Sequence, residues 1–153
     1  MRDAALEPMS SRCLHRMRRH ALGEQVSADI AVVDDEPAVL QMIQDFLQIE
    51  GYSSVGADAT SIGGLIAAGE KPRLFLIDLM LGETSGIEVA QRLHDAGFGD
   101  VPMLAVSASR AFLQMASASG LFQDVVYKPF DLADLRGRIE RHLGVPGTAW
   151  RGG

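Results

Sequence analysis

The sequence has one cysteine and no apolar run long enough to cross a membrane. Cys13 has no cysteine partner within the chain for a disulfide, which fits a reducing cytosol. A membrane-spanning helix needs about 18 or more apolar residues, and the N-terminus also lacks the apolar core of a secretory signal. Cysteine and histidine form no cluster that would suit zinc. We therefore expect a cytoplasmic protein with no membrane partner.

Positive charge is scarce outside the N-terminal segment. The net charge is -6, and residues 1–27 hold five arginines against Asp3, Glu7 and Glu24. That segment therefore carries +2, which leaves -8 on residues 28–153. An acidic body argues against nucleic-acid binding, because the phosphate backbone attracts lysine and arginine.

The length and composition indicate one ordinary globular domain. The chain has 153 residues, of which 47% are hydrophobic and 22% charged. A chain of this size buries roughly two-thirds of its unfolded surface without disulfides or a structural metal. We place the domain at residues 28–144. Residues 1–27 are expected to be a disordered basic tail, and residues 145–153 a flexible tail in which only Trp150 could dock.

Apolar strand-like runs alternate with helical patterns along this domain. The predicted strands are 29–33, 52–57, 74–78, 101–107 and 124–128. The predicted helices are 37–51, 59–69, 86–96, 109–120 and 131–144. Asp131 is expected to cap the last helix, and its expected buried stripe consists of Leu132, Leu135, Ile139 and Leu143. Five such alternations require crossover connections, so we predict a doubly wound α/β domain with a parallel sheet.

Polar residues follow four of the predicted strands. They are Asp34, Asp35 and Glu36 after the first strand, Asp78 at the third, Ser107 at the fourth and Lys128 at the fifth. In open parallel sheets, ligands bind beyond the carboxyl ends of the strands, where the strand order reverses. These residues converge there if the strand order is 2-1-3-4-5. Each alone is more often a helix cap or a solvated turn, but four in order at successive strand ends favour a site.

The residue types in this set suit phosphoryl chemistry. Carboxylates gathered at one edge repel each other unless a cation joins them, and hard oxygen ligands prefer Mg²⁺. Asp78 lies centrally and can act as a nucleophile toward phosphorus, while Lys128 and the metal neutralise the transferring oxygens. Ser107 could donate a hydrogen bond to one of those oxygens.

Four segments resemble the receiver domain of two-component response regulators, over about residues 28–144. These segments are VVDDEP, LIDLMLGETSGIEV, PMLAVSAS and VVYKPF. The resemblance implies the flavodoxin-like (βα)₅ fold, Mg²⁺ as cofactor, and a cis bond before Pro129. It also implies these roles: Asp34 and Asp35 as metal-site acids, Asp78 as phosphoacceptor, the Met80 carbonyl as a metal ligand, Ser107 as switch hydroxyl and Lys128 as phosphate-pairing lysine.

The sequence departs from that family pattern in three places. Val125 stands where an aromatic residue is usual, so Tyr127, on the same strand face, could take part in switching. The loop of residues 82–86 after the phosphoacceptor lacks the usual proline. Gly120 lies one residue farther from the lysine than is usual, which suggests an altered loop before the last strand.

The functional expectation is a stand-alone receiver in a phosphorelay. A sensor histidine kinase or a phosphotransfer protein would donate to Asp78, and output would pass to an unknown protein through the surface that includes Phe112, Met115 and Arg136. The protein is expected to be a monomer or a phosphorylation-dependent dimer, and not an enzyme beyond slow hydrolysis of its own aspartyl phosphate. One alternative is a hydrolase of the haloacid-dehalogenase type, but Met80 stands where those enzymes have a second aspartate. The other is a pseudo-receiver whose output ignores phosphorylation.

Overall fold

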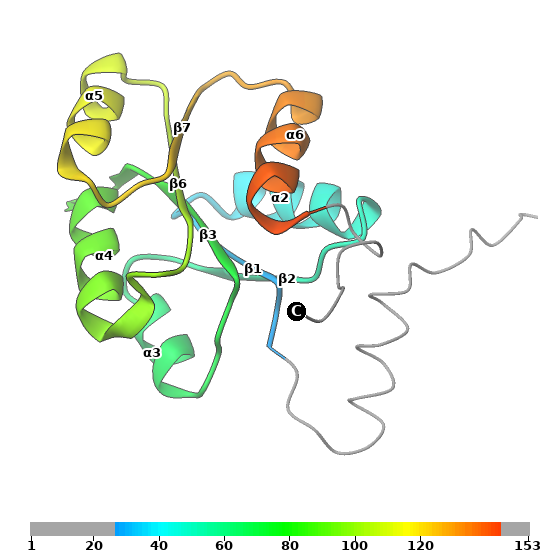
Figure 1. The fold of residues 1–153 in the computed structure, drawn as a ribbon, viewed down its shortest axis with the longest axis horizontal. Helices are drawn as coiled ribbons and strands as arrows, with labels where there is room; N and C mark the ends of the chain where they lie inside the picture. The colour runs from blue at the N-terminus through cyan, green and yellow to red at the C-terminus, as the bar shows by residue number, and fades with distance from the viewer. Residues whose placement is uncertain (1–26, 145–153) are drawn as a thin grey trace, which may run out of the picture.

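The computed structural model describes residues 27–144, which form a five-stranded parallel sheet covered by helices on both faces (Figure 1). The strand order is β2-β1-β3-β6-β7. The strands are β1 (Ile30–Val33), β2 (Ser54–Ala57), β3 (Leu74–Asp78), β6 (Met103–Ser107) and β7 (Asp124–Tyr127). In chain order this is 2-1-3-4-5, so the predicted topology is confirmed. Strand order reverses between β1 and β3, which lie side by side at the centre.

The helices divide between the two faces of the sheet as the strand order requires (Figure 1). They are α2 (Pro37–Ile49), α3 (Ile62–Ala67), α4 (Gly86–Leu93), α5 (Arg110–Ser119) and α6 (Leu132–Leu143). Helices α2 and α6 pack on one face, and α3, α4 and α5 cover the other. All five predicted helices are therefore present.

Strand β3 is buried on both faces, and this is why its sequence reads as a continuous apolar run. Leu76 points into the core beneath α2 and α6, whereas Ile77 points into the core beneath α3 and α4. Both residues are at most 1% exposed. Alternate side chains of a central parallel strand enter opposite cores, so no polar position is tolerated before Asp78.

One predicted helical detail is wrong, and a second helix differs in its last turn. Leu132 was expected in the buried stripe of the last helix, but it is 39% exposed, whereas Leu135, Ile139 and Leu143 are buried as expected. Leu132 is the first residue of α6, and helical side chains lean toward the N-terminus, so this one points past the helix end. The helix expected at 86–96 is present, but it is a regular α-helix only over α4. It continues as a single turn of π-helix, η1 (His94–Phe98).

A short antiparallel hairpin was not predicted. Strands β4 (Met80–Leu81) and β5 (Thr84–Ser85) pair directly after β3. Each strand has only two residues, too few to show an alternating pattern in the sequence. Leu81 is buried, which anchors the hairpin to the domain.

Several sequence expectations fall on residues that the structure does not describe. The tail assigned to residues 1–27 lies outside the described residues except for Ser27, whose hydroxyl accepts a hydrogen bond from the Lys71 backbone at 3.0 Å. Cys13, the 145–153 tail and Trp150 also lie outside them. Within residues 27–144, none of the helices combines the length and the apolar character that crossing a bilayer requires.

Candidate functional site

Asp78 ends the central strand with both carboxylate oxygens engaged. Its Oδ1 accepts a hydrogen bond from the Met80 backbone N–H at 2.8 Å. Its Oδ2 lies 2.6 Å from Nζ of Lys128, and the residue is 8% exposed. Strands β1 and β6 flank β3 on either side, so the backbone that carries Asp78 is held rigidly. The predicted phosphoacceptor is therefore fixed at the point where strand order reverses.

Lys128 reaches this point from the end of the edge strand β7. Its backbone N–H donates to the Ser107 carbonyl at 2.9 Å, and the peptide bond to Pro129 is cis, as the family resemblance implied. Its Nζ also lies 3.7 Å from Asp34 Oδ2. One ammonium group therefore faces two carboxylates from two other strands, although the three residues are far apart in the sequence.

Asp34 follows β1 and is 4% exposed. Its Oδ1 accepts the Glu36 backbone N–H at 2.9 Å. The pKa of Asp34 is raised from 3.8 to about 6, mainly because burial removes the water that would solvate the charged form and in part because the Asp78 charge lies nearby. The hydrogen bond from Glu36 and the Lys128 charge lower this pKa but do not offset the burial. The ionised site is thus short of positive charge.

Asp35 and Met80 lie at the rim of the site. Both are exposed, Met80 by 54%. Asp35 Oδ2 approaches the hairpin tip, since a β-carbon added to Gly82 would lie 3.6 Å from it. Among residues 27–144, no three acidic, histidine or cysteine side chains gather closely enough to hold a metal ion. The structure thus brings Asp34 and Asp78 together around Lys128 and leaves the carboxylate of Asp35 apart from them.

Ser107 ends strand β6, one residue beyond Val106, which pairs with Asp78. It is 1% exposed, and its Oγ accepts the Ser109 backbone N–H at 3.0 Å. The predicted switch hydroxyl therefore lies on the strand next to the predicted phosphoacceptor. The hydrogen bond from Ser109 connects Ser107 to the start of helix α5.

The loop at 82–86 is ordered by pairing, although it lacks the usual proline. The hairpin turns at Gly82, whose φ of 64° is in the left-handed region that favours glycine. At its other end, a β-carbon on Gly86 would overlap the Asp78 carbonyl and lie 2.7 Å from the Leu79 α-carbon. Gly86 was not singled out from the sequence, because this close approach to the β3 backbone has no local signal. It allows α4 to start directly against the strand end that carries Asp78.

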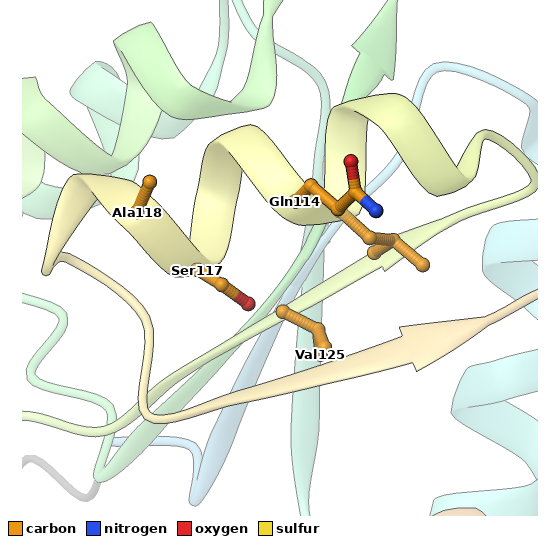
Figure 2. Close-up of a pocket in the computed structure, with 5 residues that line it drawn as sticks. Gln114, Ser117, Ala118 and Val125 are labelled. Carbon is orange, nitrogen blue, oxygen red and sulfur yellow. The ribbon is translucent and has the colours of Figure 1, made fainter.

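Val125 and Tyr127, the two candidate switch residues on β7, have different surroundings. Val125 is half-buried against the core beneath α5, and Tyr127 is 43% exposed. The Arg110 guanidinium carbon stacks 4.7 Å from the centroid of the Tyr127 ring, a contact that sequence reasoning missed. A groove of about 440 Å³ lies between α5 and β7, lined by Leu113, Gln114, Ser117, Ala118 and Val125. Figure 2 labels the last four of these residues.

Gly120 and Asp131 end and begin helices as their residue types favour. Gly120 follows α5 with a φ of 75°, the left-handed conformation common after a helix. Asp131 accepts the Ala133 backbone N–H at 2.7 Å and so caps α6, as predicted. Whether the loop after Gly120 differs from that of other receivers stays a prediction.

The fold and the site together define a doubly wound α/β domain with two aspartates and a lysine at its topological switch point. Residues 30–140 match the family described as the response regulator receiver domain. This match covers most of the chain. The protein belongs to the response regulator receiver domain family, as the resemblance of its four motifs implied.

Relatives and solved structures agree with this assignment. The phosphate regulon transcriptional regulatory protein PhoB of Pseudomonas aeruginosa is 34% identical over 122 residues, which cover 77% of this chain and 52% of that protein. The DNA-binding dual master transcriptional regulator RpaA of Synechocystis is 31% identical over 117 residues, covering 74% and 48%. The chain thus spans about half the length of these curated relatives.

Solved structures of response regulators share this fold. The receiver domain of NtrX from Brucella abortus has a TM-score of 0.68 and 28% identity, over 75% of this chain and 98% of that one. Response regulator TrrA from Thermotoga maritima, solved in complex with Mg²⁺ and beryllofluoride, has a TM-score of 0.66 and 25% identity, over 74% and 97%. They confirm the CheY-like, flavodoxin-like fold.

Proposed function

We propose that this domain accepts a phosphoryl group on Asp78 and thereby acts as a switch in two-component signalling. The observation that carries the proposal is the 2.6 Å contact between Lys128 Nζ and Asp78 Oδ2 at the switch point of the sheet. The lysine and the Met80 N–H hold the carboxylate in one orientation, which positions it for in-line attack on phosphorus. The donor is a phosphohistidine on a sensor histidine kinase or a phosphotransfer protein.

In the transfer step, one Asp78 oxygen forms a bond to phosphorus while the bond from phosphorus to the donor imidazole nitrogen breaks. The imidazole leaves with the electron pair of that bond and takes a proton from solvent. Lys128 stays beside Asp78 and pairs with the phosphoryl oxygens, and Ser107 donates a hydrogen bond to one of them. Met80 is no proton-transfer group, so rapid hydrolysis of the haloacid-dehalogenase type is not expected.

The donor set suits Mg²⁺ by its chemistry, and the carboxylate of Asp35 would turn toward Asp34 and Asp78 to complete it. The residues that would hold it are Asp34, Asp35 and Asp78, with the Met80 backbone carbonyl as a fourth ligand. The chemistry of the set supports this, because the ligands are hard oxygens and the raised pKa of Asp34 shows a buried carboxylate with too little positive charge nearby. When bound, Mg²⁺ would neutralise charge on the phosphoryl oxygens.

The phosphoacceptor role is tested by incubating the full chain with acetyl phosphate and Mg²⁺ and measuring the intact mass. We expect an acid-labile and base-labile gain of one phosphoryl group, because acyl phosphates hydrolyse at both extremes of pH. The gain should be absent from Asp78→Ala and from reactions with a chelator. Asp45→Ala, an exposed aspartate on α2, is the matched control and should retain the gain. An equal gain in Asp78→Ala would refute the assignment.

A pseudo-receiver is the second candidate, and Val125 at the usual aromatic position favours it. We infer that output passes to a protein partner and involves neither DNA nor membrane. PhoB and RpaA are named as transcriptional regulators, so DNA binding by a longer form of this protein would be a different output from the one proposed. Pull-down with and without beryllofluoride separates the candidates, because a pseudo-receiver captures the same partners in both. The same samples, run on a sizing column, show whether loading turns a monomer into a dimer.

A further inference from the structure

Arg110 and Tyr127 form an exposed pair beside the candidate site. The Arg110 guanidinium carbon lies 4.7 Å from the Tyr127 ring centroid. Each belongs to a segment that also carries a site residue. Tyr127 directly precedes Lys128 and pairs across the sheet with Ser107, and Arg110 follows Ser107 by three positions. The pair therefore connects two strand ends on the surface of the molecule.

Hydrogen bonds connect the first turn of α5 to the Ser107 hydroxyl. Ser107 Oγ accepts the Ser109 backbone N–H at 3.0 Å, and Ser109 Oγ accepts the Phe112 N–H at 3.2 Å. Ser109 is thereby the N-cap of α5, and Arg110 is the first residue of that helix. Arg110 therefore directly follows the residue whose backbone N–H is bonded to Ser107 Oγ.

An open groove of about 440 Å³ lies between α5 and β7, with Val125 on the strand side (Figure 2). Val125 and Tyr127 are two residues apart on β7 and so share a face of the strand. Val125 also packs against the core cluster that contains Leu113 and Ala116 of α5. The face of β7 that carries Tyr127 is therefore the face that contacts α5.

We propose that the Arg110–Tyr127 stack is a surface reporter of the state of Ser107, an inference that rests on the proposed phosphoacceptor function. When the Ser107 hydroxyl turns to a phosphoryl oxygen on Asp78, it leaves the Ser109 N–H without its acceptor. The first turn of α5 then shifts, and Arg110 leaves the Tyr127 ring. An exposed cation–π pair is weak, so a small shift of the helix is enough to separate it. The two arrangements pre-exist, and loading changes their populations.

Fluorine NMR of the full chain labelled with 3-fluorotyrosine tests this relay. The sequence has two tyrosines, so two protein resonances are expected. Tyr52 is buried and donates its hydroxyl hydrogen bond to the Gly144 carbonyl at 2.8 Å, which makes it an internal reference away from the site. Beryllofluoride with Mg²⁺ imitates the phosphoryl group, and its own bound fluorines report occupancy in the same spectrum. We expect the Tyr127 resonance to move on loading while that of Tyr52 stays.

Three variants make the result specific. Ser107→Ala removes a hydrogen bond to the bound group, so beryllofluoride should bind more weakly. Once the bound-fluorine signal of this variant is saturated, its Tyr127 resonance should still not move. In Arg110→Gln, that resonance should lie near its loaded position before beryllofluoride is added. Arg92→Gln, an exposed arginine on α4, should behave as wild type. Bound beryllofluoride with an unmoved Tyr127 resonance, or an unchanged response in Ser107→Ala, would overturn the relay alone. Absence of bound beryllofluoride would overturn the phosphoacceptor function and, with it, the relay.

Discussion

Replacing Asp34 with asparagine should stabilise the magnesium-free protein at neutral pH. Burial raises the pKa of Asp34 from 3.8 to about 6 in the folded state. The difference of 6 minus 3.8, at 1.36 kcal/mol per pKa unit, corresponds to about 3 kcal/mol by which the folded surroundings, Lys128 included, disfavour the charged form. Asparagine removes the charge and can still accept the Glu36 N–H. Its amide group also has to be accommodated in the buried site, so we expect a gain of about 1 to 3 kcal/mol.

The pH dependence fixes the sign of this effect. A folded-state pKa above the unfolded one means that the folded protein binds more protons between the two values. The stability contributed by Asp34 is therefore highest below pH 3.8 and falls as the pH rises through about 6. The gain in unfolding free energy of Asp34→Asn over wild type should therefore be largest above pH 6 and should vanish below pH 3.8.

The assay is urea unfolding of both proteins across this pH range, with a chelator present. Asp58→Asn is a control of opposite sign. Its hydrogen bonds with Thr60, and then Ser61, lower the pKa of Asp58 to about 2, so its contribution is present above pH 3.8 and is lost toward pH 2. That variant should be less stable than wild type at neutral pH. A loss of stability in Asp34→Asn, or a gain that does not change with pH, would refute the attribution to a buried charge.

Two further substitutions test the packing around the site and the sheet edge. Gly86→Ala should lower the free energy of unfolding by about 1 to 3 kcal/mol, since its β-carbon would overlap the Asp78 carbonyl, and thermal unfolding measures this. An unchanged midpoint would show that α4 can move away at no cost. Arg138→Gln should cost about 1 to 3 kcal/mol, because Arg138 lies 2.6 Å from the mostly buried Asp124. Arg141→Gln, 68% exposed and 4.0 Å from the same aspartate, should change it by less than about 1 kcal/mol, and equal losses would contradict the argument.

The parallel sheet could be predicted because burial on both faces of a strand leaves a continuous apolar run. The run that ends at Asp78 is apolar at every position since both faces of β3 are covered, and Asp78 itself stands at the carboxyl end of the strand. Alternation of strands and helices then indicated a parallel sheet, and the resemblance to receiver domains supplied the strand order. The same reasoning placed Asp34, Asp78 and Lys128 together, and the contacts with Lys128 confirm that proximity.

The remaining features depend on distances that no local pattern encodes. Arg110 stacks on Tyr127 across 17 positions of sequence, and Gly86 is required by a backbone that passes close to it in space. The exposure of Leu132 follows from its place at a helix end, which a helical period alone does not distinguish from a central turn. The β4–β5 hairpin was missed because two residues per strand show no periodicity.

The charge balance of the site destabilises the metal-free fold, because two carboxylates share one lysine. Lys128 is shared between Asp34 and Asp78, and it lies more than 1 Å closer to Asp78. Asp34 therefore carries the unfavourable part of the arrangement, as its raised pKa shows. A divalent cation at Asp34 and Asp35 would remove that cost and leave Lys128 free for a phosphoryl oxygen. The buried charge of Asp34 is in this way unfavourable at the place where, on our proposal, metal and phosphoryl group bind together.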